Sequence, residues 1–206
     1  AYFSGIVRNN NMNELYNSDG TRQTLTYTYM MKQFTTFNSD GAGWDITADG
    51  SKKATWRIYE GKTTPLLTAF LKTKSLVTET EYDGTEKAFD QTLVTGNSQV
   101  NELNSAAYSA KETNAGVYDE TKTFYSDSQQ GYNIVDTKLV IQPKTLTLVN
   151  SKTYDGTTSV IASAIGLKSS DIIGNDAVTL TAGKVTGLYA DKNVGANKAV
   201  TYTIDD

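Results

Sequence analysis

The sequence predicts a mainly β protein. Three observations lead to this prediction: the 206 residues include 31 Thr and 13 Tyr, short turns rich in Gly, Asn and Asp recur along the chain, and only 2 residues are Pro. β-Branched and aromatic side chains favour strands, and Gly, Asn and Asp favour the turns between them. Hydrophobic residues make up 38% of the chain, which indicates folded modules rather than disorder.

Residues 1–71 form the first of three predicted segments, with Asn- and Gly-rich turns such as SGIVRNNNMNELYNSDG. Strands are expected at residues 3–7, 23–29 and 55–59. In TLTYTYM, Thr alternates with larger side chains at the period of two that is typical of a strand. The short unit of strand and turn is typical of coils that stack into a solenoid.

The end of this segment, WDITADGSKKATWRIYEG, predicts a cap. A solenoid has an open end whose strand edges would pair with other chains unless something covers them. We expect Lys52, Lys53 and Arg57 to face water. The side chains expected to cover the last coil are Trp44, Ile46, Trp56 and Ile58.

Residues 72–142 and 143–206 are predicted to be divergent copies of one small β module. Each opens with an apolar/polar alternation and then contains Tyr-Asp-Gly-Thr, at positions 72 residues apart. An Asn-x-Gly follows the Tyr after 32 residues in the first copy (82 to 114) and after 39 in the second (154 to 193), so we expect a loop insertion in the second. The signature residues are Tyr82, Asp83, Gly84, Thr85, Asn114 and Gly116, and Tyr154, Asp155, Gly156, Thr157, Asn193 and Gly195.

The two copies are expected to differ at their ends. A strand-like run at residues 137–141 closes the first copy, whereas the sequence stops about 13 residues after Asn193 in the second. We therefore expect the second copy to lack its last strand. The chain also begins at Ala1 without an initiator Met, so we expect it to be a piece of a larger array.

Catalysis is not expected from these residues. The chain has no His and no Cys, which removes the commonest general base, the commonest zinc ligand, thiolate metal sites and disulfides. Acidic residues gather at 79–86, but Asp83 and Asp155 are better explained as turn residues that accept backbone N–H bonds. Gly84 and Gly156 would supply the positive φ of such turns. A pair of carboxylates facing each other, as glycosidases need, is not expected.

No cofactor is expected, although calcium stays open as an alternative. Asp19, Asp40, Asp45 and Asp49 punctuate the first segment, and acidic turns can supply the oxygen ligands that calcium prefers. The chain lacks the D-x-D-x-D-G loop of known calcium motifs, so hairpin turns explain its two NSDG stretches more simply.

Charge and aromatic residues bear on the possible partners. The net charge is −4 and the basic residues are scattered, so nucleic acid is not expected as a partner, and no apolar run is long enough for membrane insertion. Exposed aromatic rings could stack on sugars, with burial in β modules as the competing interpretation. The candidate ligand-contact residues are Trp44, Tyr59, Tyr108 and Tyr118.

Three stretches in order, KTYDGTTSV, GNDAVTLTAG and LYADKNVGANKAVTYT, resemble the YDG repeat of very large filamentous-haemagglutinin-like bacterial adhesins, which are exported by two-partner secretion. Residues 72–142 are similar to the related MBG-type modules, although KET rather than a bare Lys precedes their Asn-x-Gly. SGIVRNNN and LYNSDG are similar to the Gly-rich β-helix repeats of these adhesins, with Arg8 where that repeat usually has Gly. MMKQFTTF through TPLL is similar to the segment that closes the β-helix.

The resemblance implies a right-handed β-helix that ends with its cap near Leu71, followed by two small β modules of a β-grasp-like or sandwich-like type. It implies a secreted protein of the bacterial cell surface, a stalk or filament that attaches to host or other cells without catalysis. The implied partners are a surface glycan or protein and, for the full-length protein, an outer-membrane transporter. A carbohydrate- or glycoprotein-binding tip is the alternative, and a polysaccharide-degrading β-helix enzyme is the second.

Overall fold

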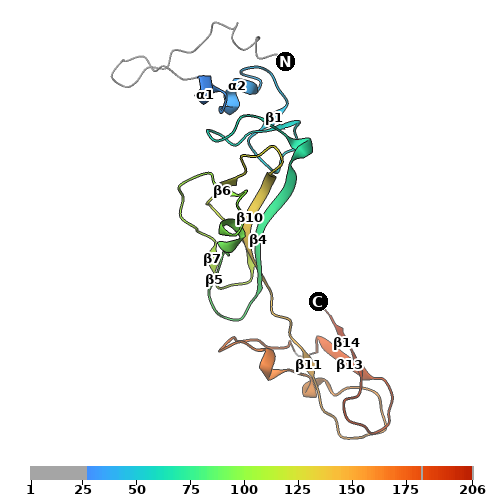
Figure 1. Cartoon of the computed structure of the whole chain (residues 1–206). Helices are drawn as coiled ribbons and strands as arrows, with labels where there is room; N and C mark the ends of the chain where they lie inside the picture. Colours follow the sequence, from blue (N-terminus) through green and yellow to red (C-terminus); the bar gives the residue numbers. More distant parts are fainter. Residues whose placement is uncertain (1–26, 182, 206) are drawn as a thin grey trace. The chain divides into compact units, whose positions relative to one another are not determined.

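The computed structural model describes residues 27–181 and 183–205, and this part is mainly β (Figure 1). It divides into two compact units. Unit 1 comprises the described residues up to 80 together with 87–112 and 116–140. Unit 2 comprises residues 81–86 and 113–115 and the described residues from 141 onward. None of the helices in these residues is both long and apolar enough to cross a lipid bilayer.

Some predictions fall on residues that lie outside the described part. These are the strand at 3–7, the β-helix coils with Arg8, and the possible calcium ligand Asp19. The boundaries of the three predicted segments, at 71/72 and 142/143, stay predictions.

Residues 27–71 form short elements. They are α1 (Tyr27–Met30), α2 (Phe34–Phe37), β1 (Ile46–Thr47), β2 (Trp56–Arg57), β3 (Leu66–Leu67) and the 3₁₀ helix η1 (Thr68–Phe70). β2 is the central strand of a three-stranded sheet, parallel to β1 and antiparallel to β3. The strand expected at 55–59 is confirmed for residues 56 and 57, which form β2.

The strand expected at 23–29 is wrong where the structure describes it, because α1 occupies Tyr27–Met30. The chain turns here through local hydrogen bonds, from Lys32 N–H to the Tyr29 carbonyl (3.0 Å) and from Gln33 N–H to the Met30 carbonyl (3.2 Å). The Thr36 hydroxyl also donates to the Met30 carbonyl at 2.7 Å. Alternation of Thr and Tyr over a few residues is a weak signal, since such local bonds satisfy the backbone without a partner strand.

The predicted cap residues Trp44 and Trp56 belong to a row of three aromatic rings. The centroid of Trp44 lies 4.9 Å from that of Phe37 and 5.0 Å from that of Trp56. Phe37 is fully buried, whereas both Trp side chains are half-buried. Backbone bonds hold the row together, from Trp44 N–H to Phe37 O and from Trp56 N–H to Asp45 O.

Trp56→Ala is therefore expected to lower the free energy of unfolding by about 2 kcal/mol, less than for a fully buried Trp. Urea denaturation followed by circular dichroism measures the change. Phe70→Ala is the control, because Phe70 is 63% exposed and its loss should change stability by about 0.5 kcal/mol or less. Equal stability of the two variants would contradict a structural role of the Trp row.

Arg57 does not face water as expected: it is 4% exposed and lies over the ring of Tyr59, with 4.1 Å between the guanidinium carbon and the ring centroid. Its guanidinium donates to the carbonyls of Thr47 (3.3 Å) and Ile58 (2.5 Å) and to the Asn133 side chain (3.2 Å). The Tyr59 hydroxyl donates to the Tyr132 carbonyl at 2.8 Å. Within unit 1, the segment before residue 72 is thus bound to the start of a strand from the next segment.

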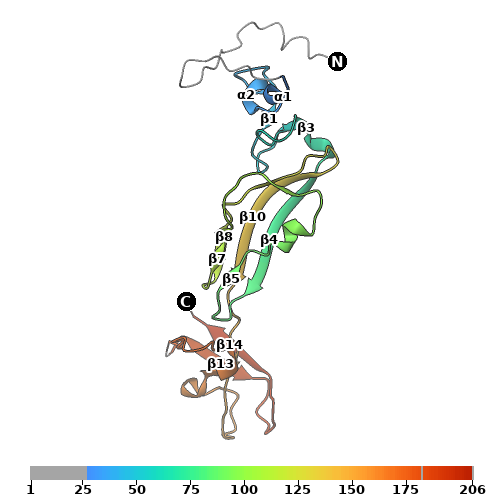
Figure 2. The same cartoon turned by 60° about the vertical axis from the view of Figure 1, so that its left-hand side comes forward.

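Residues 72–142 contain two long strands, β4 (Lys72–Glu81) and β10 (Tyr132–Gln142), and several short elements. The short elements are β5 (Lys87–Ala88), α3 (Thr92–Thr95), β6 (Asn101–Glu102), β7 (Lys111–Glu112), β8 (Gly116–Asp119) and β9 (Phe124–Tyr125). β10 contains the strand expected at 137–141. It lies between β4 and β8 in one sheet (Figure 2), while β5 pairs with β7 and β6 with β9.

β4 and β10 run parallel. Lys72 N–H donates to the carbonyl of Gly131, just before β10, and Tyr82 N–H, just after β4, donates to the carbonyl of Gln142. These bonds join start to start and end to end, which is possible only for strands of the same direction. Leu76 of β4 and Leu139 of β10 are fully buried and form part of the core of this sheet.

Residues 143–205 form shorter strands. They are β11 (Leu148–Val149), β12 (Gly166–Leu167), β13 (Val185–Tyr189) and β14 (Val200–Ile204), with the 3₁₀ helices η2 (Ala162–Ala164) and η3 (Ser169–Asp171). β11 pairs with β12 and β13 with β14, both antiparallel. Ser159 makes an isolated bridge to Leu188 on the other side of β13.

Candidate functional site

The two Tyr-Asp-Gly-Thr tetrapeptides form the same turn. One oxygen of Asp83 accepts the N–H (2.9 Å) and the hydroxyl (2.6 Å) of Thr85. Asp155 accepts the same two groups of Thr157, both at 2.9 Å. Each Asp thus holds the backbone two residues further on, as an Asx turn requires.

The glycine of each turn has the backbone conformation that the sequence predicts, with φ of 76° at both Gly84 and Gly156. Residues with a side chain rarely adopt such a positive φ, because their Cβ would collide with the following carbonyl oxygen. Gly84 has a second reason to lack a side chain, since a Cβ there would lie 2.6 Å from Cγ2 of Ile173.

The tyrosines of the two turns differ. The Tyr82 hydroxyl donates to a carboxylate oxygen of Asp176 at 2.9 Å, and this hydrogen bond raises the pKa of Tyr82. Glu81 forms an ion pair with Lys144. Tyr154, by contrast, is 62% exposed. The first tetrapeptide therefore packs against residues of the second copy inside unit 2, which its position in the sequence did not indicate.

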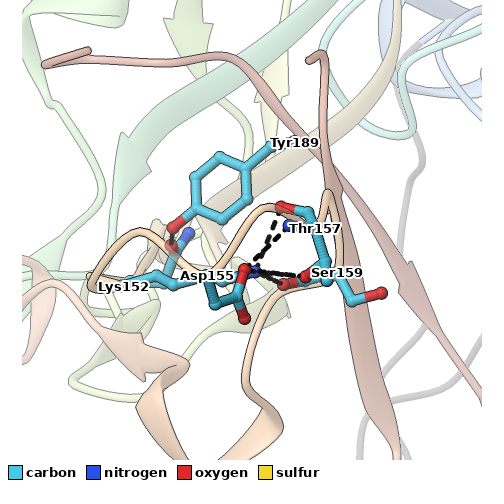
Figure 3. A network of polar contacts seen from close by, with 6 residues as sticks. Lys152, Asp155, Thr157, Ser159 and Tyr189 are labelled. Carbon is cyan, nitrogen blue, oxygen red and sulfur yellow. Dashed lines mark hydrogen bonds and ion pairs between the residues drawn. The ribbon is translucent and has the colours of Figure 1, made fainter. Parts of the chain in front are cut away.

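Lys152 is the centre of a polar network around the second turn (Figure 3). Its side chain is 5% exposed, and its ammonium lies 2.6 Å from a carboxylate oxygen of Asp155. The ammonium also donates to the hydroxyl (2.7 Å) and carbonyl (3.2 Å) of Thr157 and to the carbonyl of Ser159 (2.7 Å), and it lies 5.9 Å from the centroid of the Tyr189 ring. All these acceptors lie within the module, so the charge is satisfied internally.

The carboxyl of Asp155 is expected to titrate near pH 2. The hydrogen bond from Lys152, with those from Thr157, lowers its pKa from 3.8 to about 2. Because the folded-state pKa is depressed, the ionised carboxylate stabilises the fold fully above pH 3.8, and this contribution is lost as the pH falls through about 2. Carboxyl NMR measures the midpoint. Lys152→Met should move it toward 3.8, and an unchanged midpoint would contradict the role of Lys152.

The Asn-x-Gly of the second copy lies in a loop held in a similar way. Asp191 accepts the N–H of Asn193 at 2.7 Å and forms an ion pair with Lys198. The ammonium of Lys198 also donates to the Asn193 carbonyl at 2.6 Å. The hydrogen bond from Lys198 lowers the pKa of Asp191. In both signature stretches of this copy, a lysine thus neutralises an aspartate that holds the backbone.

The two stretches meet at a cavity of about 350 Å³. Its lining includes both lysine–aspartate pairs and the exposed rings or chains of Tyr154 and Val194. The signature residues that line it are Tyr154, Asp155, Thr157, Asn193 and Gly195. In the first copy, Asn114 is exposed and belongs to unit 2, whereas Gly116 starts β8 in unit 1, where a Cβ would meet the Tyr118 hydroxyl at 2.8 Å.

The candidate ligand-contact aromatics are not all available to a ligand. Tyr59 is 1% exposed, so its assignment as a surface contact is wrong: it packs under Arg57 and binds the Tyr132 carbonyl. Tyr108 is half-buried in a stack with Phe89 (5.8 Å), and Trp44 belongs to the Trp row. Tyr118 is half-buried as well.

The aspartates considered for calcium hold turns in the described part. Asp45 accepts from the N–H and hydroxyl of Thr55, both at 2.8 Å, and Asp49 accepts from the N–H and hydroxyl of Ser51. Asp40 accepts from Asn38 at 3.2 Å. No group of three or more acidic side chains in residues 27–181 and 183–205 is arranged to hold a metal ion.

Sequence reasoning missed two buried charged residues near the end of β8, Glu120 and Lys122. The Glu120 carboxylate accepts the N–H groups of Ser109, Ala110 and Lys122 at 2.8 to 3.1 Å. Burial pushes its pKa up, but these backbone bonds outweigh burial and lower the pKa. Lys122 forms an ion pair with Glu102 at 2.8 Å. Two charges in a Thr-rich stretch give no signal of burial, because the partners come from elsewhere in the chain.

Comparison with known families assigns part of the chain. No curated protein and no solved structure matches it. The YDG domain family matches residues 136–205, from the middle of β10 to the end of the described part. This range contains Tyr154, Asp155, Gly156 and Thr157 and the cavity beside them. Residues 136–205 are thus a YDG domain, which is consistent with YDG/MBG-type modules in this chain.

Proposed function

We propose that this chain is a structural segment of a secreted bacterial surface adhesin of the filamentous-haemagglutinin-like class, exported by two-partner secretion. Its modules form part of a stalk that attaches the cell to host or neighbouring cells, and they act without catalysis. The partner at the far cell is a surface glycan or protein, and an outer-membrane transporter exports the full-length protein.

One observation carries this proposal: the polar groups of the repeated signature are used inside the protein. Asp83 and Asp155 hold turns, and Lys152 is bonded to four acceptors of its own module. A catalytic site instead aims acids, bases or nucleophiles at a position that a substrate can occupy. Side chains whose hydrogen bonds stabilise turns of their own module favour a structural role for the module, as a spacer in a stalk. The YDG domain at 136–205 supports the same class of protein.

Surface exposure tests the proposal. Antibodies raised against the purified chain should label intact cells of the bacterium that produces it, and brief external protease treatment should remove the labelling. Deleting the outer-membrane transporter gene should abolish surface labelling while the protein remains detectable inside. Labelling that requires permeabilised cells would contradict the proposed location.

A carbohydrate- or glycoprotein-binding tip is a second candidate, favoured by the exposed Tyr154 in the lining of the cavity. Aromatic rings can stack on sugar faces. A glycan array probed with the chain tests this candidate. Binding that Tyr154→Ala abolishes, and that the control Phe70→Ala retains, would favour a tip over a spacer. Silence of the array, with surface labelling intact, favours the spacer.

A further inference from the structure

Residues 143–205 bury few apolar side chains. Val185 is the one buried hydrophobic residue among the described residues of this stretch, whereas Leu76 and Leu139 are fully buried in residues 72–142. Large apolar side chains are exposed instead, including Val149 (41%), Leu188 (57%) and Ile204 (65%). Exposed apolar side chains in one small module indicate an interaction surface that a binding partner covers.

Two strands of this module have a free edge. In the described residues, β11 pairs only with β12, and β14 pairs only with β13. Strand edges carry unpaired N–H and C=O groups, which are templates for another strand. The module therefore offers two lines of unpaired backbone groups as well as exposed apolar side chains.

The hydrogen-bond register tells which groups of β14 face outward. Asp205 N–H donates to Lys184 O, and Ala190 N–H donates to Ala199 O. Antiparallel pairs alternate between bonded and non-bonded, so the backbone groups of every second residue point away from β13. In β14 the outward groups belong to Val200, Tyr202 and Ile204.

The outward groups of β11 follow from its hydrogen bonds with β12. Lys168 N–H donates to the carbonyl of Thr147, which makes this pair a bonded one. The next pair, Leu148 and Leu167, is then non-bonded. The N–H and C=O of Leu148 therefore point away from β12. Asn150 follows the same alternation.

The first copy contains the strand that would fit such edges. There β10 lies between β4, which leads into Tyr-Asp-Gly-Thr, and β8, which follows Asn114. In the second copy, β11 leads into the same tetrapeptide and β14 follows Asn193. The counterpart of β10 would thus lie between β11 and β14.

The side chain of Asn150, directly after β11, already links this strand to the β13–β14 hairpin. The Asn150 amide donates to the Tyr202 hydroxyl of β14 and accepts from the Tyr189 hydroxyl of β13. These hydrogen bonds join side chains only, and no backbone group of β11 or β14 takes part in them. β11 and the β13–β14 hairpin are therefore held together without using the backbone groups of either edge.

We propose that the edges of β11 and β14 are an interaction surface for one extended polypeptide segment that pairs between them and runs parallel to β11. Its chemistry is that of residues 131–142, GYNIVDTKLVIQ, in which apolar side chains such as Ile134, Leu139 and Ile141 are buried in the first copy. Insertion would pair the outward N–H and C=O groups and cover exposed apolar side chains. This inference goes beyond the stalk proposal and does not depend on it.

A peptide with the sequence of residues 131–142, added to the purified chain, tests the proposal. Hydrogen exchange followed by NMR should show amide protection of Leu148, Asn150, Val200, Tyr202 and Ile204 rising about tenfold or more, because local opening must then also break the added strand. The same sequence fused after residue 206 through a flexible Gly/Ser linker should give the same protection at higher effective concentration.

Two matched controls isolate the edge. A peptide carrying Leu139→Asp and Ile141→Asp keeps the backbone but loses the apolar face, and it should not protect these amides. In the chain, Ile204→Pro removes an outward N–H that the hairpin does not use, so it should abolish protection while leaving the melting temperature without peptide unchanged. Ile204→Val keeps the N–H and should retain protection.

Several outcomes would overturn the proposal. Absence of protection with both the free and the fused strand rules out the surface. Equal protection by the Asp-containing peptide, or protection that survives Ile204→Pro, rules out specific pairing at these edges. Protection of the same amides without peptide, together with dimers in sedimentation, would replace the proposed occupant by a second copy of the chain.

Discussion

Arg57→Ala is expected to lower the free energy of unfolding of unit 1 by about 4 kcal/mol. The guanidinium is buried, lies over Tyr59 and donates to the carbonyls of Thr47 and Ile58 and to the Asn133 side chain. Its loss leaves buried acceptors without donors, each of which costs about 1–3 kcal/mol, and removes the packing of its stem.

Equilibrium urea denaturation measures this change. Lys53→Ala is the matched control, because Lys53 is an exposed basic residue four positions earlier and its loss should change stability by about 0.5 kcal/mol or less. Arg57→Lys should still destabilise, since an ammonium lacks the fork that serves three acceptors. If Arg57→Ala and Lys53→Ala are equally stable, the buried network does not stabilise the fold.

The β4–β10 pair is expected to resist force along the chain. Force that enters at Lys72 and leaves at Gln142 pulls two parallel strands in opposite directions, so their hydrogen bonds are loaded together. Force applied at Glu81 and Gln142, which lie at the same end of the pair, opens the bonds one after another. If shear breaks two more bonds in one step, at about 1 kcal/mol each, the pair should survive about thirtyfold longer at equal force.

Single-molecule force spectroscopy tests this prediction, and the absence of Cys lets two engineered thiols define the pulling points. Lys72→Cys with Gln142→Cys gives the shear geometry, and Glu81→Cys with Gln142→Cys gives the opening geometry. All three positions are exposed, so the substitutions should not disturb the core. Equal lifetimes in the two geometries would contradict the prediction, as would a longer lifetime at the shared end.

Local structure could be predicted wherever its causes lie within a few residues. The turn at Asp83 and Gly84 is one example, because an Asp that bonds two residues on and a Gly that adopts positive φ need no distant partner. The strand at 137–141 is another, as its run of β-branched and apolar residues favours β10. The helix at 27–30 shows the limit, since alternation over a few residues competes with local hydrogen bonds.

The candidate site was less predictable. The sequence placed Asp155 in a turn, but it did not indicate that Lys152 would neutralise it or that Asn193 would line the same cavity. Tyr59 was expected as a ligand contact and is buried, because its hydroxyl reaches the Tyr132 carbonyl of a distant strand once the chain is folded. Tyr59 and Tyr132, and the two stretches that line the cavity, lie far apart in the sequence, where composition and spacing carry no information.

The sequence by itself determined the mainly β class, the repeated turn and the strand at 137–141, because these follow from backbone preference and turn chemistry. Only the tertiary structure decided which charges are buried and which strands run side by side. The parallel pairing of β4 and β10 and the open edges of β11 and β14 belong to this second group. The physical reason is that burial and strand pairing depend on partners brought together from distant parts of the chain.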